Sequence, residues 1–243
     1  MMSLAAALPP LPRVQVLRAS RALAKLLKDP DDLPQVFTII ESMSGTAIHR
    51  LVLGFNLGKE GRKLLQERPD LGAVLADRER LRAMPDGSLG RAYLAFVESE
   101  GISAEGIRDA SEVGRQPVNL NQQFLFVRDR MRDTHDLWHA VTGYKGDVLG
   151  ELALLAFGLA QNWNVAIAAI VVAGILKGYG TSDVGMIADG YRRGWKANRW
   201  FPALEWESLL ERPLEDVRRE LGVEAVPTYV PLRTTELRAQ GVI

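Results

Sequence analysis

The sequence predicts an all-α protein, a single-domain helical bundle. Apolar residues recur at helical spacing over nearly the whole chain, and strand-like segments do not alternate with helices as they would in an α/β protein. No internal repeat and no Ser/Gly-rich linker divides the 243 residues, which are enough to bury a sizeable core. We therefore expect one all-helical domain over residues 13–243, preceded by an extended, proline-containing lead-in at 1–12.

Capping residues and apolar periodicity predict the individual helices. They are expected, in chain order, at 13–28, 32–43, 59–67, 89–98, 119–142, 181–198 and 213–222. In the last of these, Pro213 stands at the start, acidic residues precede basic ones, and Gly222 follows the final turn. The first has a basic face, formed by Arg18, Arg21, Lys25 and Lys28. Such a face could lie on anionic lipid, although a solvated face is favoured.

The longest uncharged segment, residues 152–176, is long enough to be tested as a membrane span. The sequence Gln-Asn-Trp-Asn at 161–164 divides it into apolar pieces of 9 and 12 residues, and neither piece can cross a bilayer alone. Unpaired amides are also costly in hydrocarbon. A helix buried in a protein core is therefore favoured over a transmembrane helix.

Composition excludes several classes of site and partner. The chain has no cysteine, so disulfides, thiolate metal sites and cysteine nucleophiles are excluded, and any metal must be held by His, Asp or Glu. Thirty basic residues balance thirty acidic ones, whereas a charge-driven nucleic-acid binder normally has a basic excess. We therefore expect no nucleic-acid partner.

Two of the three histidines, His135 and His139, lie four residues apart in a segment expected to be helical. On a helix this spacing places both imidazoles on one face, with Cβ atoms about 5 to 6 Å apart, so one element can supply two metal ligands. Asp136 is rotated by about 100° from His135 and could complete the ligand shell or orient a ligand. A helical histidine pair alone is also compatible with two imidazoles that are merely hydrogen-bonded.

The residues after His139 predict a third ligand. Thr-Gly-Tyr-Lys-Gly at 142–146 indicates a helix stop and a tight connection, and Asp147 can cap a second, antiparallel helix. His139 then lies about one turn before the first helix ends, and Glu151 about one turn after the second begins. Glu151 interrupts an apolar stretch, where an unpaired carboxylate would be costly. We predict that both histidines and Glu151, with or without Asp136, bind a divalent cation that keeps a position open for substrate or water.

The pattern His-Asp-x-x-His, followed after eleven residues by Glu, resembles the signature of the coenzyme Q biosynthesis protein 4 family. Three weaker stretches agree with it: Gly-Arg-Ala-Tyr at 90–93, the segment 128–132, and Pro-Leu-Glu-Asp-Val-Arg-Arg-Glu-Leu-Gly at 213–222. The similarity spans about residues 37–230.

The resemblance implies an all-helical protein that holds a divalent ion, taken as Zn²⁺, through His135, Asp136, His139 and Glu151. It implies removal of the C1 carboxyl group of a polyprenylated 4-hydroxy-3-methoxybenzoate, with or without hydroxylation, in ubiquinone synthesis. The implied partners are the prenylated lipid, other enzymes of the pathway and a membrane surface. In a bacterium this is the cytoplasmic side of the inner membrane, and in a eukaryote the matrix side of the mitochondrial inner membrane. We also expect a homo-oligomer.

The implied chemistry needs groups that handle charge and protons. A cation can polarise the substrate oxygens, and Asp136 or Glu151 could transfer the proton if either is not a ligand, which makes them the predicted catalytic residues. Arg91 or Arg115 could pair with the substrate carboxylate, although a surface or packing role is favoured for both. Tyr93 is expected in the core.

The apolar helices suggest two further features. The prenyl tail is expected in a channel beside Leu152, Leu155, Leu159, Ala169, Ile170 and Ala173, although Leu and Ala at helical spacing are also typical of plain core. Aromatic and basic residues are mixed at Arg192, Arg193, Trp195, Lys196, Arg199, Trp200, Phe201 and Trp206. They could form an interfacial belt, but buried rings with charges outside are favoured.

Three other functions are open at this point. One is a non-catalytic scaffold that binds prenyl lipid and organises other enzymes. Another is an HD-type phosphohydrolase, in which His135 and Asp136 would act with His49 and with Asp183 or Asp189. A zincin peptidase fits less well, because Asp136 is shorter than the glutamate used as the base there.

Overall fold

The computed structural model of the chain describes residues 13–43, 45–114, 121–179, 184–223 and 228–243. The predicted all-α class is confirmed, since these residues form helices and contain no strand, only an isolated bridge between Ser88 and Pro213. The predicted lead-in at 1–12 lies outside the described residues.

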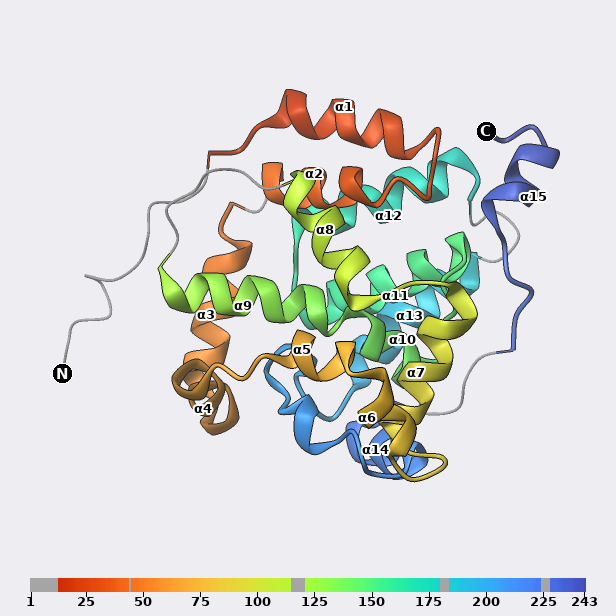
Figure 1. Cartoon of the computed structure of the whole chain (residues 1–243). Coiled ribbons are helices and arrows are strands. Elements are labelled where there is room, and N and C mark those ends of the chain that lie inside the picture. Colours follow the sequence, from red (N-terminus) through yellow and green to blue (C-terminus); the bar gives the residue numbers. More distant parts are fainter. Residues whose placement is uncertain (1–12, 44, 115–120, 180–183, 224–227) are drawn as a thin grey trace.

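Figure 1 shows the arrangement of the helices, with α11 near the centre of the molecule and α1 along one edge. In chain order they are α1 (Val16–Leu26), α2 (Leu33–Met43), α3 (Ala47–Leu57), α4 (Lys59–Glu67), α5 (Leu71–Ala76), α6 (Arg78–Ala83), α7 (Leu89–Glu100), α8 (Ala104–Gly114), α9 (Gln122–Asp133), α10 (His135–Thr142), α11 (Val148–Gln161), α12 (Val165–Lys177), α13 (Val184–Lys196), the short 3₁₀ helices η2 (Phe201–Ala203) and η3 (Trp206–Ser208), α14 (Leu214–Leu221) and α15 (Thr234–Ala239).

Most predicted helices are present, but several observed ones were not predicted: α3, α5, α6, α8 and α15. Helices α5 and α6 have only six residues each, too few for apolar periodicity to register. Each begins at an aspartate whose carboxylate accepts a main-chain N–H three residues later, Asp70 from Ala73 at 2.9 Å and Asp77 from Arg80 at 3.0 Å. The capping aspartate before each helix was therefore the local sequence signal for both helix starts.

The helix predicted at 119–142 is instead two helices, α9 and α10. Asn121 caps α9 through hydrogen bonds from the main-chain N–H groups of Gln123 and Phe124. Thr134 separates the two helices but keeps a right-handed helical backbone, with φ −81° and ψ −12°. His135 and His139 thus lie in α10, a short helix that is separate from α9.

The uncharged segment, predicted as a buried helix, instead belongs to two helices, α11 and α12, which are separated at its amide residues. Asn164 caps α12 by accepting the N–H of Ala166 at 2.9 Å, and the side-chain amide of Gln161 donates to the carbonyl of Gly194 at 2.6 Å. Among the residues described, no helix combines the length and apolar character that a bilayer crossing requires.

Helices α11 and α13 pack with their backbones in close approach. A Cβ atom on Gly190 would collide with the carbonyl oxygen of Ala153, and one on Gly194 with that of Phe157. Glycine at these two positions lets the two helices meet at the centre of the core.

Buried rings rather than an interfacial belt occupy the region after α13. Phe201 and Trp206 have no exposed surface, and the ring of Phe201 lies 5.5 Å from that of Trp138 and 5.0 Å from that of Phe157. Trp195, in contrast, is 73% exposed. The four aromatic residues of the predicted belt therefore form no common exposed surface; they are Trp195, Trp200, Phe201 and Trp206.

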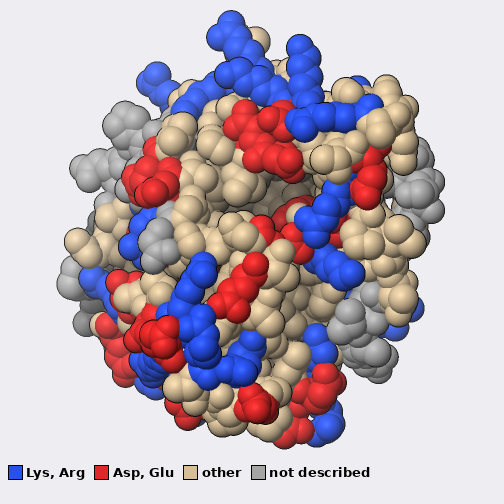
Figure 2. Space-filling model, turned by 45° about the vertical axis from the view of Figure 1, so that its right-hand side comes forward, with Lys and Arg blue, Asp and Glu red and all other residues tan. Residues whose placement is uncertain are grey.

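Helix α1 is amphipathic and packs on α2. It buries Ala19, Ala22 and Leu26, while Arg21 and Lys25 are exposed. Figure 2 shows Lys and Arg side chains gathered along the upper edge of the molecule, where α1 lies in Figure 1.

Candidate metal centre

The two helices that carry the predicted ligands begin and end as their sequence indicates. Helix α10 stops at Gly143, which adopts the left-handed conformation with φ 80° and donates its N–H to the carbonyl of His139 at 2.8 Å. Asp147 caps α11 by accepting the N–H groups of Leu149 at 3.1 Å and Gly150 at 3.3 Å. The connection is only five residues long, so the end of α10 and the start of α11 lie together.

The structure brings His135, His139 and Glu151 to one point, with one ligand atom of each within 4.8 Å of the others. The two Nε2 atoms are 3.3 Å apart, and the carboxylate oxygens of Glu151 lie 3.4 Å from Nε2 of His135 and 3.1 Å from Nε2 of His139. Tetrahedral coordination with metal–nitrogen bonds of about 2.0–2.1 Å requires ligand atoms about 3.3 Å apart. The two Nε2 atoms therefore have the spacing of adjacent ligands of a tetrahedral site, and each of them faces a different oxygen of the Glu151 carboxylate.

His139 is held in the tautomer that a metal ligand needs. Its Nδ1 lies 2.9 Å from the main-chain carbonyl of Tyr144. Because a carbonyl only accepts, Nδ1 carries a proton and Nε2 presents its lone pair to the centre in the neutral ring. The ring is fully buried and stacks on Phe96 from α7, with centroids 4.7 Å apart.

Electrostatics couple the three groups in the absence of an ion. Burial lowers the pKa of His135, but the hydrogen bond to Glu151 and the charge of its carboxylate outweigh burial and raise it to about 9. Burial favours the neutral form of Glu151, yet the two imidazoles hold the pKa of this carboxylate well below its usual range. A proton thus occupies the position between ring and carboxylate that a cation would take.

Asp136 lies beside this group but outside it. It is 4% exposed, and the atoms that meet at the centre do not include its carboxylate. Burial raises the pKa of Asp136, while the nearby His135 and His139 lower it by less. A buried carboxyl group with a raised pKa, next to a possible cation site, is suited to holding a proton.

A large apolar cavity opens at the centre. It has a volume of about 630 Å³, and His135, Asp136 and Glu151 are among its lining residues. The rest of its wall is mostly aliphatic and includes Leu26, Val36, Ile40, Leu155, Ile167 and Ile170. Figure 2 shows a hollow, bordered by charged side chains, below the basic edge of the molecule.

The cavity wall includes only some of the residues predicted to lie beside a prenyl tail. Leu152, Leu155 and Ile170 line the cavity, whereas Leu159, Ala169 and Ala173 do not. The cavity wall also includes residues of α1, α2 and α3, which the sequence did not associate with the site.

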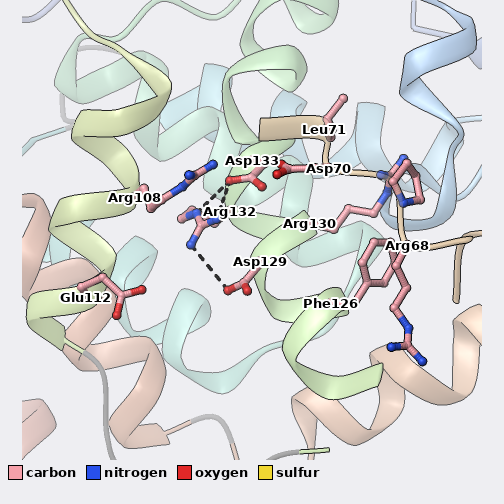
Figure 3. Close-up of a pocket in the computed structure, with 11 residues that line it drawn as sticks. Arg68, Asp70, Leu71, Arg108, Glu112, Phe126, Asp129, Arg130, Arg132 and Asp133 are labelled. Atoms are coloured by element: carbon pink, nitrogen blue, oxygen red, sulfur yellow. Dashed lines mark hydrogen bonds and ion pairs between the residues drawn. The ribbon is translucent and has the colours of Figure 1, made fainter. Parts of the chain in front are cut away.

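A second, charged pocket of about 430 Å³ lies against α9 and was not predicted. Figure 3 shows Arg132 between Asp129 and Asp133, with Arg108 reaching toward them from α8. Arg132 and Asp129 line both this pocket and the apolar cavity. The only local sequence signal for this charged pocket was the run Arg-Asp-Arg-Met-Arg-Asp at 128–133.

The other sequence candidates lie elsewhere. His49 packs its ring on Phe124, with centroids 4.8 Å apart, and is not part of the metal-ligating group. Asp189 pairs with Arg192. Arg91 pairs with Asp86 at 3.1 Å and donates to a main-chain carbonyl. Tyr93 is in the core, as expected, and Asp183 and Arg115 lie outside the described residues.

Comparison with known families identifies a match over most of the chain. The family model described as "Coenzyme Q (ubiquinone) biosynthesis protein Coq4" matches residues 7–227. The chain belongs to the Coq4 family. The predicted resemblance is thereby confirmed, and the match covers all four residues of its signature.

Several curated Coq4 relatives come from fungi. The chain is 29% identical over 175 residues to the mitochondrial ubiquinone biosynthesis protein of Aspergillus terreus, and 30% identical over 185 residues to that of Yarrowia lipolytica. These matches cover 71% and 69% of this chain, but only 59% and 63% of the relatives. This chain therefore spans less than two thirds of their length.

A solved structure shows the same fold. The crystal structure of a protein from Nostoc punctiforme, entitled "Putative ubiquinone biosynthesis protein", superposes with a TM-score of 0.64 at 21% identity. The superposition covers 87% of this Coq4 chain and 99% of the Nostoc chain.

Proposed function

We propose that this Coq4 protein acts in ubiquinone biosynthesis as a metal-dependent decarboxylase of a polyprenylated 4-hydroxy-3-methoxybenzoate. The observation that carries the proposal is the juxtaposition of three metal-ligating groups with an apolar cavity. The cavity volume of about 630 Å³ falls in the range of about 300–1,000 Å³ common to small-molecule sites. Family membership supports the pathway.

His135, His139 and Glu151 would hold the divalent ion. Two imidazoles and one carboxylate are a ligand set known for catalytic Zn²⁺, with the fourth position open. When bound, the ion supplies a Lewis acid that polarises substrate oxygens. The hydrogen bond from His139 to the carbonyl of Tyr144 would fix one ligand in place.

Asp136 would supply the proton. Decarboxylation breaks the bond between ring carbon C1 and the carboxyl carbon, leaves the electron pair on C1 and releases carbon dioxide. The pair must then take up a proton, and Asp136 is a buried carboxyl group with a raised pKa that lines the same cavity. If hydroxylation accompanies the reaction, an oxidant is needed, because Zn²⁺ does not change its oxidation state.

The aliphatic wall of the cavity would hold the prenyl tail. Residues of α1, α2, α11 and α12 supply apolar surface next to the metal-ligating group. A tail held there would direct the aromatic head toward His135 and Glu151, because both line the cavity.

Location and partners follow from the same proposal. The fungal relatives are named mitochondrial, which supports a mitochondrial location in a eukaryotic setting. The matrix side of the inner membrane there, and the cytoplasmic side of the inner membrane in a bacterium, remain predictions. The exposed basic residues of α1 would suit a peripheral contact with anionic lipid. Association with other enzymes of the pathway and a homo-oligomeric state remain predictions.

The deciding experiment is incubation of Zn²⁺-loaded protein with the prenylated benzoate labelled in its carboxyl carbon. We expect labelled carbon dioxide from the wild-type protein and none above background from His139→Ala. Stoichiometric capture of the lipid without release of carbon dioxide would reject the decarboxylase and favour the scaffold.

A further inference from the structure

The loop that joins α10 to α11 is held by a segment more than eighty residues further along the chain. The hydroxyl of Tyr229 donates to Oδ2 of Asp147 at 2.6 Å and accepts the main-chain N–H of Lys145 at 2.8 Å. Leu232 donates its N–H to Oδ1 of Asp147 at 2.8 Å, and its carbonyl accepts the N–H of Val148 at 2.9 Å. Four hydrogen bonds thus fix the loop from outside.

The same loop positions two of the three candidate ligands. Its Tyr144 carbonyl accepts the hydrogen bond that orients His139, at 2.9 Å. Its Asp147 caps α11, and the Asp147 carbonyl accepts the N–H of Glu151 at 2.8 Å in the first turn. A shift of the loop would therefore move the imidazole and the carboxylate relative to each other.

The packing around Gly150 indicates a built contact. A Cβ atom on Gly150 would lie 2.5 Å from the hydroxyl oxygen of Tyr229 and closer still to the carbonyl oxygen of Lys145. Only glycine leaves room for the hydroxyl to reach Asp147, whose side chain is buried with 2% exposure. Burial and the neighbouring carboxylate raise the pKa of Tyr229, so its hydroxyl remains a hydrogen-bond donor.

We infer that Tyr229, together with the backbone of Leu232, is a clamp that sets the metal affinity of the centre formed by His135, His139 and Glu151. Tyr229 is a positioning residue, since its hydroxyl contacts the loop and not the candidate ligands. This inference rests on the proposed function to the extent that the centre binds a divalent ion.

The test compares two conservative variants, Tyr229→Phe and Tyr179→Phe. Tyr179 is a matched control, because its hydroxyl also donates one short hydrogen bond, to the carbonyl of Leu27 at 2.6 Å, but away from the loop. Zn²⁺ affinity is measured by competition with a chromophoric chelator, and the stability of the metal-free proteins by thermal unfolding. We expect affinity to fall about tenfold in Tyr229→Phe and to stay within about twofold of wild type in Tyr179→Phe.

A further variant, His139→Ala, shows whether the measured ion is at the centre. Wild-type Zn²⁺ affinity in Tyr229→Phe, together with loss of binding in His139→Ala, overturns the clamp and leaves the proposed function standing. An equal loss of affinity in both tyrosine variants also overturns the clamp, because it would reflect general destabilisation. Zn²⁺ binding that is unchanged in His139→Ala overturns both the clamp and the proposed function.

Discussion

His139 donates the proton on its Nδ1 to the carbonyl of Tyr144 across 2.9 Å, and this bond decides which atom the imidazole turns toward Glu151. The Nε2 lone pair faces a carboxylate oxygen 3.1 Å away and the Nε2 atom of His135 3.3 Å away. Three electron-rich atoms at these distances repel one another unless a proton or a cation lies between them.

Metal content should depend on both helices. We expect about one divalent ion per chain in the wild-type protein and strong loss in His139→Ala and Glu151→Ala, because each removes one of three ligands. Elemental analysis of the purified proteins measures this. His49→Ala is the control, since His49 packs on Phe124 outside the centre and should keep its metal. Equal metal in all four proteins would contradict the centre as described.

Substitutions of Asp136 and Glu151 should have different effects, because Asp136 would donate a proton whereas Glu151 would bind the metal. Asp136→Asn removes a buried carboxyl group that is outside the ligand group, so we expect the metal to stay and decarboxylation to fall by about 10²- to 10⁴-fold. Glu151→Gln should lose metal and activity together. The measurements are metal content and turnover of the same preparations. Loss of metal from Asp136→Asn would instead identify Asp136 as a fourth ligand.

Metal affinity should rise with pH up to about 9. The hydrogen bond to Glu151 and its charge outweigh burial and raise the pKa of His135 to about 9, so below that pH an ion must displace a proton. Zn²⁺ affinity should then increase roughly tenfold per pH unit between about pH 7 and 9, with one proton released per ion. Calorimetry in buffers of different ionisation enthalpy counts that proton. An affinity that does not change over this range would show that His135 is already unprotonated.

Gly190, at the contact between α11 and α13, should not tolerate replacement by a residue with a Cβ atom. In Gly190→Ala the new Cβ collides with the carbonyl oxygen of Ala153, so we expect the free energy of unfolding to fall by about 1 to 3 kcal/mol. Gly106→Ala is the matched control in α8, because its Cβ would meet only the hydroxyl of Ser103 at 3.5 Å. That variant should gain about 0.4 to 1 kcal/mol. Chemical denaturation compares the two, and equal effects would contradict the close approach.

The sequence alone predicted the features that depend on neighbours within a few turns. The spacing of His135 and His139, the stop at Gly143 and the cap at Asp147 are local, because a helix repeats every 3.6 residues and its ends are satisfied by adjacent groups. The level placement of Glu151 follows from that short connection. The 17 residues 135–151 therefore predicted both the candidate centre and the family resemblance.

Only the tertiary structure decided which distant groups surround that centre. Phe96 stacks on His139 from α7, Tyr229 reaches the loop from the C-terminal segment, and α1 and α2 complete the cavity. The carboxylate of Asp136 is not among the atoms of His135, His139 and Glu151 that lie within 4.8 Å of one another, although its position beside His135 in sequence allowed this. Such contacts join residues tens of positions apart, and their distances depend on how whole helices pack, which no local spacing fixes.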